Sequence, residues 1–233
     1  MTQPNGAAVA AHRAVGFDVD GVLGASEHLG ERRWSRFAAA RGRTWTAQQT
    51  RQVQGMSAPE WSAFLAGFSV AEESAAAAER LVVDDMIGAL HGGEIELLPG
   101  AERMITEVAA RAPIALASSA PRRLIDAVLD RHGLTEFFAA TVSSAEVPRG
   151  KPSPDVYREA ARRLAQDPQA CLAVEDSSNG LRAAAAAAMT VVAIPSPDYP
   201  PAEDALAAAG FVAADLDEVR LHLLDSLSAA VAG

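Results

Sequence analysis

Two aspartates, Asp18 and Asp20, stand one residue apart directly after the short apolar run Ala14–Phe17, and Gly21 follows them. The run predicts a buried strand whose carboxyl end delivers both carboxylates. Because side chains alternate along an extended segment, the two aspartates should point to the same side. Two like charges in one small space trap a proton or hold a cation, and Mg²⁺ takes oxygen ligands of this kind. Taken alone, the same residues are equally typical of a strand-ending turn.

Two further apolar runs end in residues that suit a phosphate group. Ile114–Ala117 leads into Ser118 and Ser119, whose hydroxyl and backbone N–H groups can bind a phosphate oxygen, although an ordinary helix cap has the same residues. After the run Ala139–Val142, the segment RGKPSPD holds Lys151 between stiffening prolines just before a predicted helix. A solvated loop lysine is the alternative for that position.

A third run, Cys171–Val174, is followed by the adjacent acids Glu175 and Asp176 and then by SSNG. Two acids where a helix begins could merely satisfy the helix dipole. Four polar strand ends together are harder to explain as separate caps, because the carboxyl edge of an open α/β sheet is where ligands bind. Whether the four ends meet depends on the strand order, which periodicity does not reveal.

Short apolar strands alternate with helical segments from about residue 97 onward, which predicts an α/β fold with a parallel sheet covered on both faces. The predicted strands are Ala14–Phe17, Ile114–Ala117, Ala139–Val142, Cys171–Val174, Val191–Ile194 and a weak one at Phe211–Ala213.

The region 26–96 has a different character, with helical patterns and no convincing strand. Its candidate helices are Glu31–Arg41, Ala58–Ala66 and Ala71–Leu90, and the segment SAPE at 57–60 predicts a capping box with proline in the first turn. Residues 1–13 carry no periodicity and predict a flexible tail. The predicted division is therefore a core of residues 14–25 and 97–233 with a helical insert at 26–96.

Composition limits the partners. The chain of 233 residues is 49% hydrophobic and has a formal net charge of −10, which argues against nucleic acid and against an anionic membrane surface. No apolar run approaches the roughly 20 residues of a membrane span. The amino terminus is a poor secretory signal, so the cytoplasm is the expected location. The oligomeric state is not indicated.

The four motifs DVDGVL, SS after a strand, GKPSPD and VEDSSNG occur in this order and at family-like spacing. Together they resemble the haloacid dehalogenase superfamily, in the subgroup of β-phosphoglucomutase and small sugar-phosphate phosphatases. The resemblance covers nearly the whole chain from Ala14. It implies a Rossmann-like core and identifies region 26–96 as an inserted α-helical cap.

The resemblance also implies roles for the acids. Asp18 would be the nucleophile that forms an aspartyl-phosphate, and Asp20 would protonate the leaving alcohol and then deprotonate the attacking water. Asp18, the backbone carbonyl of Asp20 and Asp176 would bind Mg²⁺, with Glu175 beside them as a further metal-site acid.

Ser118 and Lys151 would, by the same resemblance, bind the oxygens of the phosphoryl group. This fits a physical requirement, because a carboxylate cannot approach a phosphate dianion unless cations offset the repulsion. Mg²⁺ and Lys151 would supply those positive charges.

Related chemistries can be weighed on single residues. A metal-free dehalogenase would not need Asp20 or the Glu175–Asp176 pair, and a phosphonatase needs a cap lysine, which region 26–96 lacks. A phosphosugar mutase is the serious alternative. In the family that this chain resembles, β-phosphoglucomutases carry an arginine where this chain has Ala58 and a histidine where it has Gly30.

The predicted function is an Mg²⁺-dependent phosphatase of small phosphorylated metabolites, with sugar or polyol phosphates favoured. The alternatives are a phosphosugar mutase and, from another class, a catalytically silent binding or regulatory protein. Three tryptophans of the cap, Trp34, Trp45 and Trp61, are expected to form its own core rather than a platform for substrate.

Overall fold

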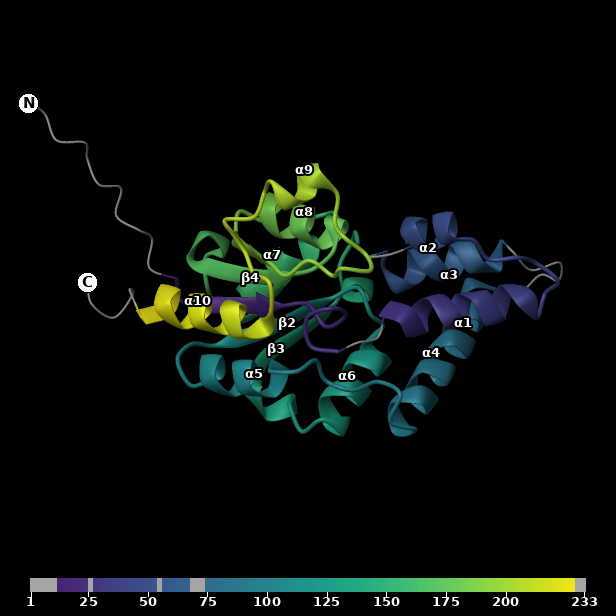
Figure 1. The fold of residues 1–233 in the computed structure, drawn as a ribbon, viewed down its shortest axis with the longest axis horizontal. Coiled ribbons are helices and arrows are strands. Elements are labelled where there is room, and N and C mark those ends of the chain that lie inside the picture. The colour runs from purple at the N-terminus through teal and green to yellow at the C-terminus, as the bar shows by residue number, and fades with distance from the viewer. Residues whose placement is uncertain (1–11, 25–26, 54–55, 68–73, 229–233) are drawn as a thin grey trace, which may run out of the picture.

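The computed structural model describes residues 12–24, 27–53, 56–67 and 74–228. Six parallel strands form one sheet in the order β3-β2-β1-β4-β5-β6, as Figure 1 shows in part. Every strand predicted from the sequence is present, with each end within one residue of the prediction. The strands are β1 Ala14–Phe17, β2 Ile114–Ser118, β3 Phe138–Ser143, β4 Cys171–Glu175, β5 Thr190–Ala193 and β6 Phe211–Val212.

The central position of β1 brings the polar strand ends together. Phe17 at the end of β1 pairs with Leu116 of β2 on one side and with Val174 of β4 on the other. Asp18 therefore leaves the sheet beside Glu175, the last residue of β4, and close to the end of β2. This order is the feature that the sequence pattern could not supply.

Helices cover both faces of the sheet, and this confirms the predicted α/β class. Helices α5 and α6 lie on one face, where α10 packs against α5, while α7, α8 and α9 lie on the other face (Figure 1). Their bounds are α5 Ala101–Ala109, α6 Arg122–Arg131, α7 Asp155–Arg163, α8 Ser178–Ala186, α9 Glu203–Leu206 and α10 Leu216–Ser228. Short 3₁₀ helices η1 Thr135–Phe137, η2 Ser144–Glu146 and η3 Pro168–Ala170 complete the core.

Successive residues of a strand point to opposite faces of the sheet, and here one face carries large side chains and the other carries alanines. Phe17, Leu116 and Val174 pack toward α5, α6 and α10, whereas Ala115 and Ala173 pack toward α7 and α8. All five side chains are fully buried. Because the alanine face is nearly flat, α7 and α8 approach the sheet closely, and this allows side chains from α7 to reach the strand ends.

Four helices form a separate group at the end of the molecule that the carboxyl ends of the strands face (Figure 1). They are α1 Glu27–Ala39, α2 Ala47–Val53, α3 Ala58–Ala66 and α4 Ala75–His91. Helix α3 and its capping box match the prediction, with the Ser57 N–H donating to Glu60 Oε2 at 2.9 Å. Helix α2 was not predicted. The start proposed for the last helix, residues 71–73, lies outside the described residues.

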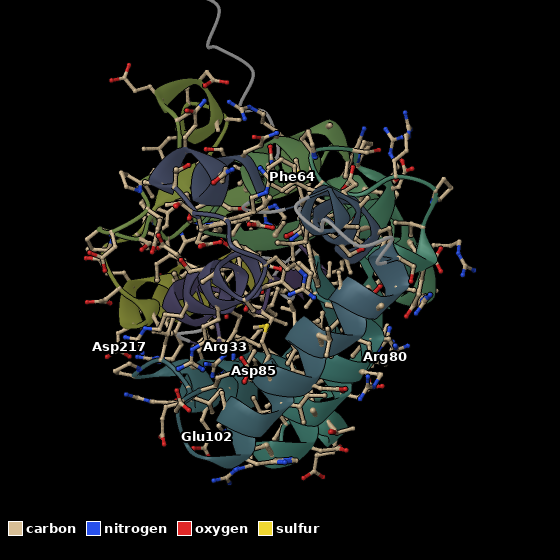
Figure 2. All side chains as sticks on the ribbon, turned by 90° about the vertical axis from the view of Figure 1, so that its right-hand side faces the viewer. Arg33, Phe64, Arg80, Asp85, Glu102 and Asp217 are labelled. Carbon is tan, nitrogen blue, oxygen red and sulfur yellow. The ribbon has the colours of Figure 1, made fainter. Side chains whose placement is uncertain are left out.

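Packing within the helical group combines an ion pair of the buried Arg33 side chain with aromatic contacts. Arg33 of α1 is only 4% exposed, and its Nε lies 2.9 Å from Asp85 Oδ2 of α4 (Figure 2). The Trp45 ring lies 5.9 Å from the Trp34 ring and 6.0 Å from that of Phe64. These contacts join α1, α3 and α4 and the segment before α2 into one body.

The two connections between the helical group and the core run side by side. Gly24 forms an antiparallel bridge with Leu97, and the Leu98 N–H donates to the Leu23 carbonyl at 2.8 Å. We propose this paired crossing as the boundary between the core and a cap of residues 26–96. Of the predicted tail, residues 1–11 lie outside the described residues, and Arg13 already joins the core through the Ala170 carbonyl. No described helix has the length and hydropathy needed to cross a membrane.

Candidate active site

Four of the predicted site residues meet at the carboxyl edge of β1 and β4. The Lys151 ammonium donates to Asp18 Oδ1 at 2.9 Å and to Glu175 Oε1. Oxygens of Asp18, Glu175 and Asp176 lie within 4.8 Å of one another, and all three residues are buried. Side chains separated by up to 158 positions in the sequence therefore share one small space.

A tight turn after β1 positions the aspartates. The Leu23 and Gly24 N–H groups both donate to the Val19 carbonyl, which folds residues 19–24 back on themselves. Gly21 has φ +72°, a conformation that favours glycine, and a Cβ at this position would overlap the Asp176 carboxylate. The glycine of the DVDG motif is thus required both by its backbone conformation and by its acidic neighbour.

Glu175 is held by hydrogen bonds on both carboxylate oxygens. Its Oε1 accepts from Lys151 and from the Tyr157 hydroxyl at 2.7 Å, while Oε2 accepts from the Asp176 N–H at 3.2 Å and the Ser177 hydroxyl at 3.3 Å. This satisfies a fully buried acid that would otherwise be costly to desolvate. Glu175 therefore fixes Lys151 and remains close enough to the other acids to belong to a metal site.

Tyr157 is a site residue that sequence reasoning missed. It is fully buried in α7, packs against Gly16 of β1 and donates its hydroxyl to Glu175. A signal was present in the sequence: Tyr157 is the polar member of a helix face otherwise formed by Val156, Ala160 and Ala161. That face predicts burial, and a buried tyrosine hydroxyl needs a hydrogen-bond partner.

Ser118 ends β2 next to the cluster of acids and Lys151, but its contacts differ from those of the acids. Its side chain is fully buried, and its hydroxyl accepts a hydrogen bond from the Ala120 N–H at 3.1 Å. The neighbouring Ser119, unlike Ser118, lines the cavity above the cluster, together with Asp20 and Ser177. The assignment of Ser118 to phosphate remains a prediction, and Ser119 joins it as a candidate.

Burial and neighbouring charges set the protonation of the site. Burial raises the pKa of Asp18 to about 7, although the Lys151 ammonium opposes this shift. Burial alone would lower the pKa of Lys151, but the carboxylates of Asp18 and Glu175 outweigh burial and raise it well above its ordinary value. Burial also raises the pKa of Tyr157, so its hydroxyl remains a donor to Glu175 at neutral pH. Lys151 is accordingly a permanent cation.

The acid cluster fits a divalent cation. Three buried carboxylates face one ammonium, so full ionisation leaves two negative charges in excess. A low-dielectric site does not retain such an excess without protonation or a counterion. The donors are carboxylate oxygens, the ligands that Mg²⁺ prefers. The residues present are therefore suited to Mg²⁺.

A cavity opens between the acid cluster and the cap. Trp34 and Trp61 pack in the hydrophobic core, as expected, and both also line the cavity. Their rings belong to the cap interior and to the cavity wall at once. Trp45 lies behind them and donates its indole N–H to Thr50.

The arginines just past Ser119 are engaged elsewhere. Arg122 donates to Glu146 and Thr141 within the core, and Arg123 donates to Asp84 of α4 at 2.8 Å, an exposed link between core and cap. Neither arginine is among the described residues that line the cavity.

A single methyl group added at Gly180 should inactivate the protein. Gly180 lies in the first turn of α8, and a Cβ there would overlap the carboxylate of Glu175, which cannot retreat because Lys151 and Tyr157 hold it. We expect Gly180→Ala to lower the free energy of unfolding by about 1–3 kcal/mol, the usual cost of overpacking. Displacement of Glu175 and Lys151 should also remove most activity, as measured by phosphate release.

The matched control is Gly88→Ala in α4, another helical glycine, around which a Cβ would meet nothing within 4 Å. It should keep full activity and gain about 0.5–1 kcal/mol of stability. Wild-type activity in Gly180→Ala would show that the position of Glu175 is unimportant.

Comparison with known proteins gives the family. The sequence matches the haloacid dehalogenase-like hydrolases over residues 12–188. It is 31% identical to validoxylamine A 7'-phosphate phosphatase of Streptomyces hygroscopicus subsp. limoneus over 209 residues, which span 88% of this chain and 94% of that protein. It is also 46% identical over 105 residues, 44% of this chain, to the bifunctional riboflavin kinase/FMN phosphatase of Arabidopsis thaliana. The matched segment spans only 28% of the length of the Arabidopsis protein.

Among solved structures, that of CbbY from Rhodobacter sphaeroides in complex with phosphate superposes with a TM-score of 0.81. Its sequence is 29% identical, and the superposition covers 92% of this chain and 99% of that one. The fold, the ordered motifs and the near-full-length phosphatase relative agree with one another. This chain belongs to the haloacid dehalogenase-like hydrolases, as a phosphoric monoester hydrolase.

Proposed function

We propose that the protein is an Mg²⁺-dependent phosphatase of small phosphorylated metabolites, of the sugar and polyol phosphate type, and that it works through an aspartyl-phosphate on Asp18. The observation that carries this proposal is the buried cluster in which Lys151 joins Asp18 to Glu175. A carboxylate held beside a permanent cation is suited to meet a phosphate dianion. The net charge of −10 argues against nucleic acid as the substrate.

In the first step, a carboxylate oxygen of Asp18 attacks phosphorus while the bond from phosphorus to the substrate's oxygen breaks. The carboxyl group of Asp20 gives its proton to that departing oxygen, so the product leaves as a neutral alcohol. Asp20 is suited to this role because it lines the cavity and is less buried than Asp18. The result is a phosphoryl group bonded to Asp18 and an ionised Asp20.

In the second step, Asp20 takes a proton from a water molecule as that water attacks the phosphorus of the aspartyl-phosphate. The bond from phosphorus to Asp18 breaks, inorganic phosphate leaves, and both aspartates return to their starting states. Lys151 and the serines at the end of β2 would bind the phosphoryl oxygens throughout. Asp18, Asp176 and the Asp20 carbonyl would hold Mg²⁺, with Glu175 beside them; the ion supplies positive charge that offsets the repulsion between carboxylate and phosphate.

The similar proteins support the substrate class. Validoxylamine A 7'-phosphate phosphatase is named for a small phosphorylated metabolite, and the CbbY structure was obtained with phosphate. We transfer from them the general class, a phosphate monoester of a small metabolite, and no individual substrate.

A mutase must also bind a second phosphate, and the described lining of the cavity holds no second cationic side chain for it. Lys151 is the single cationic side chain among the described residues that line the cavity, and two carboxylates already engage it. Ala58, which replaces the arginine expected of a mutase, is fully buried at the start of α3. Given β-glucose 1-phosphate with a trace of the 1,6-bisphosphate, the protein should therefore release phosphate faster than it forms glucose 6-phosphate. Faster isomerisation would favour the mutase.

The proposed function is tested by phosphate release from acetyl phosphate, a small substrate that makes few demands on the cap, and from a panel of phosphorylated sugars and polyols. Turnover should require Mg²⁺, stop with a chelator and return when the metal is restored. Turnover that persists in chelator-treated protein would contradict the metal dependence. Mg²⁺ binding without turnover of any substrate would point to the silent binding protein.

Mg²⁺ affinity should depend on pH through Asp18. In the metal-free protein burial raises the pKa of Asp18 to about 7, so below that pH the folded protein carries a proton that a metal ion must displace. Release of one proton weakens binding by about tenfold for each pH unit below 7 and leaves it nearly constant above. Calorimetric titration with Mg²⁺ between pH 5.5 and pH 8.5, spanning about 1.5 units on either side, measures this. Asp18→Asn should remove the slope, and an equal slope in that variant would assign the proton to another group.

A further inference from the structure

The cap side of the cavity, as far as the described residues form it, is largely apolar. Of the seven described cap residues that line it, four carry no hydrogen-bond donor, two are tryptophans whose polar group is one indole N–H each, and one is a threonine. These seven are Trp34, Thr50, Val53, Met56, Trp61, Val82 and Met86. The facing wall, at the start of α6, is formed by Ala120, Pro121 and Leu124 and is equally apolar.

The polar residues near this wall are already engaged. Thr50 is 4% exposed, and its hydroxyl accepts the indole N–H of Trp45 at 2.9 Å. Tyr199 at the rim donates its hydroxyl to Glu31 Oε2 of α1 at 2.7 Å. Ser119 and Ser177 line the opposite end, next to the acid cluster. A hydroxyl group that enters the cap end would lose water and meet mainly carbon atoms, which is unfavourable.

The charges divide the cavity in the same way. Its charged lining residues, among those described, are Asp18, Asp20, Lys151 and Asp176, and all four belong to the core. One end of the cavity is therefore built for a charged phosphate and a metal ion, and the other for an uncharged apolar group. A ligand that fills both ends has its phosphate at Asp18 and its apolar part beneath the cap.

We infer that the preferred substrate is a phosphate monoester whose alcohol part carries an apolar ring, aromatic or alicyclic, which the cap encloses between Trp34, Trp61 and Met86. This inference rests on the proposed phosphatase function, keeps its class of small phosphate monoesters, and replaces the sugar or polyol part with an apolar ring. The ring gains by leaving water, and the flat tryptophan faces can pack against it. A fully hydroxylated sugar of the same size gains less, because most of its hydroxyl groups would meet carbon atoms of the described wall residues.

Two synthetic substrates separate these possibilities. Cyclohexylmethyl phosphate and glucose 6-phosphate both carry phosphate on a methylene group attached to a six-membered ring, and they differ in the ring hydroxyls and ring oxygen. The apolar ester should have the higher kcat/KM, by roughly tenfold to a hundredfold. Intrinsic reactivity does not explain that result, because the electron-withdrawing oxygens of glucose make its alkoxide the better leaving group.

Variants of Met86 test whether the cap wall sets this preference. Met86→Gln keeps the length of the side chain but places an amide at the wall, and it should lower the ratio of the two kcat/KM values by about tenfold. Met86→Leu should keep the ratio, since it changes shape without adding a polar group. Ile87→Gln is the matched control on the same helix, because Ile87 packs against the core cluster and does not line the cavity.

Failure of this inference differs from failure of the phosphatase function. Equal or better use of glucose 6-phosphate by the wild-type protein would overturn the inference, provided that acetyl phosphate is hydrolysed with Mg²⁺. If acetyl phosphate is not hydrolysed, or if Asp18→Asn hydrolyses it at the wild-type rate, the proposed function fails and takes the inference with it. Should Met86→Gln not fold, as judged by circular dichroism, the wild-type ratio still decides.

Discussion

Asp18→Asn should release no measurable phosphate, a loss of roughly four decades or more in kcat, because the removal of a covalent nucleophile is among the largest effects of single substitutions. The amide has nearly the shape of the carboxylate, so the fold should persist. An amide oxygen is a poor nucleophile, however, and cannot form an acyl phosphate under these conditions. Lys151 can still donate to the oxygen that replaces Oδ1, which it reaches at 2.9 Å in the wild-type protein.

Two further aspartate variants serve as controls for Asp18→Asn, one at the proton donor and one at an exposed position. Asp20→Asn should slow both chemical steps while leaving substrate binding largely intact, because it removes the proton donor and not the nucleophile. Asp126→Asn on α6 alters an exposed pair with Arg122 and should leave turnover unchanged, since such surface pairs contribute about 0–1 kcal/mol. Phosphate release near the wild-type rate by Asp18→Asn would contradict covalent catalysis.

Lys151→Arg should be nearly as damaging as Lys151→Ala, although it keeps the positive charge. The ammonium is 1% exposed and lies between Asp18 and Glu175, with the Tyr157 ring centroid 5.1 Å away. An ammonium is a compact charge, whereas a guanidinium is a wide planar fork that this enclosed position does not accommodate. The lost partner for a developing charge costs about 3–4 kcal/mol, or roughly two to three decades in kcat.

Arg149→Lys is the control for Lys151→Arg, because it also exchanges one basic residue for the other but does so at an exposed position. Arg149 is 71% exposed two residues away and pairs with Asp155, so its replacement by lysine should leave kcat unchanged. Lys151→Ala also leaves the buried acids without their cation, and thermal unfolding should show a loss of about 3–5 kcal/mol. A fully active Lys151→Arg variant would make this residue an ordinary cation and remove the geometric requirement.

Most of the core could be predicted because its strands are short, apolar and separated by helices with clear ends. The capping box at Ser57 and Glu60 fixed α3 to the residue, since both of its hydrogen bonds are local in sequence. Helix α2, with the sequence AQQTRQV, has no apolar stripe long enough to predict it. Its stability depends on contacts such as that of the buried Val53, which arise from tertiary packing.

The site was predictable to the extent that its chemistry is local. Asp18 follows β1, Glu175 ends β4 and Lys151 lies in the segment after β3. The strand order β3-β2-β1-β4 brings them to one edge of the sheet. That order depends on pairings between residues 99 positions apart for β1 and β2 and 157 apart for β1 and β4, which no local pattern encodes. Tyr157 could have been suspected from its place on a buried helix face. The cavity wall formed by Trp34 and Trp61 could not, because a tryptophan pattern on a helix does not tell a core from a pocket.

Detection of the aspartyl-phosphate tests the central claim most directly. The protein is mixed with Mg²⁺ and a rapidly hydrolysed substrate, quenched in acid during turnover, and digested for mass spectrometry. We expect the peptide that contains Asp18 to gain the mass of one phosphoryl group, and we expect this gain to be absent in Asp18→Asn and to accumulate in Asp20→Asn if dephosphorylation is the slower step. An unmodified Asp18 peptide in samples quenched during active phosphate release, or the phosphoryl group on any other residue, would contradict the mechanism.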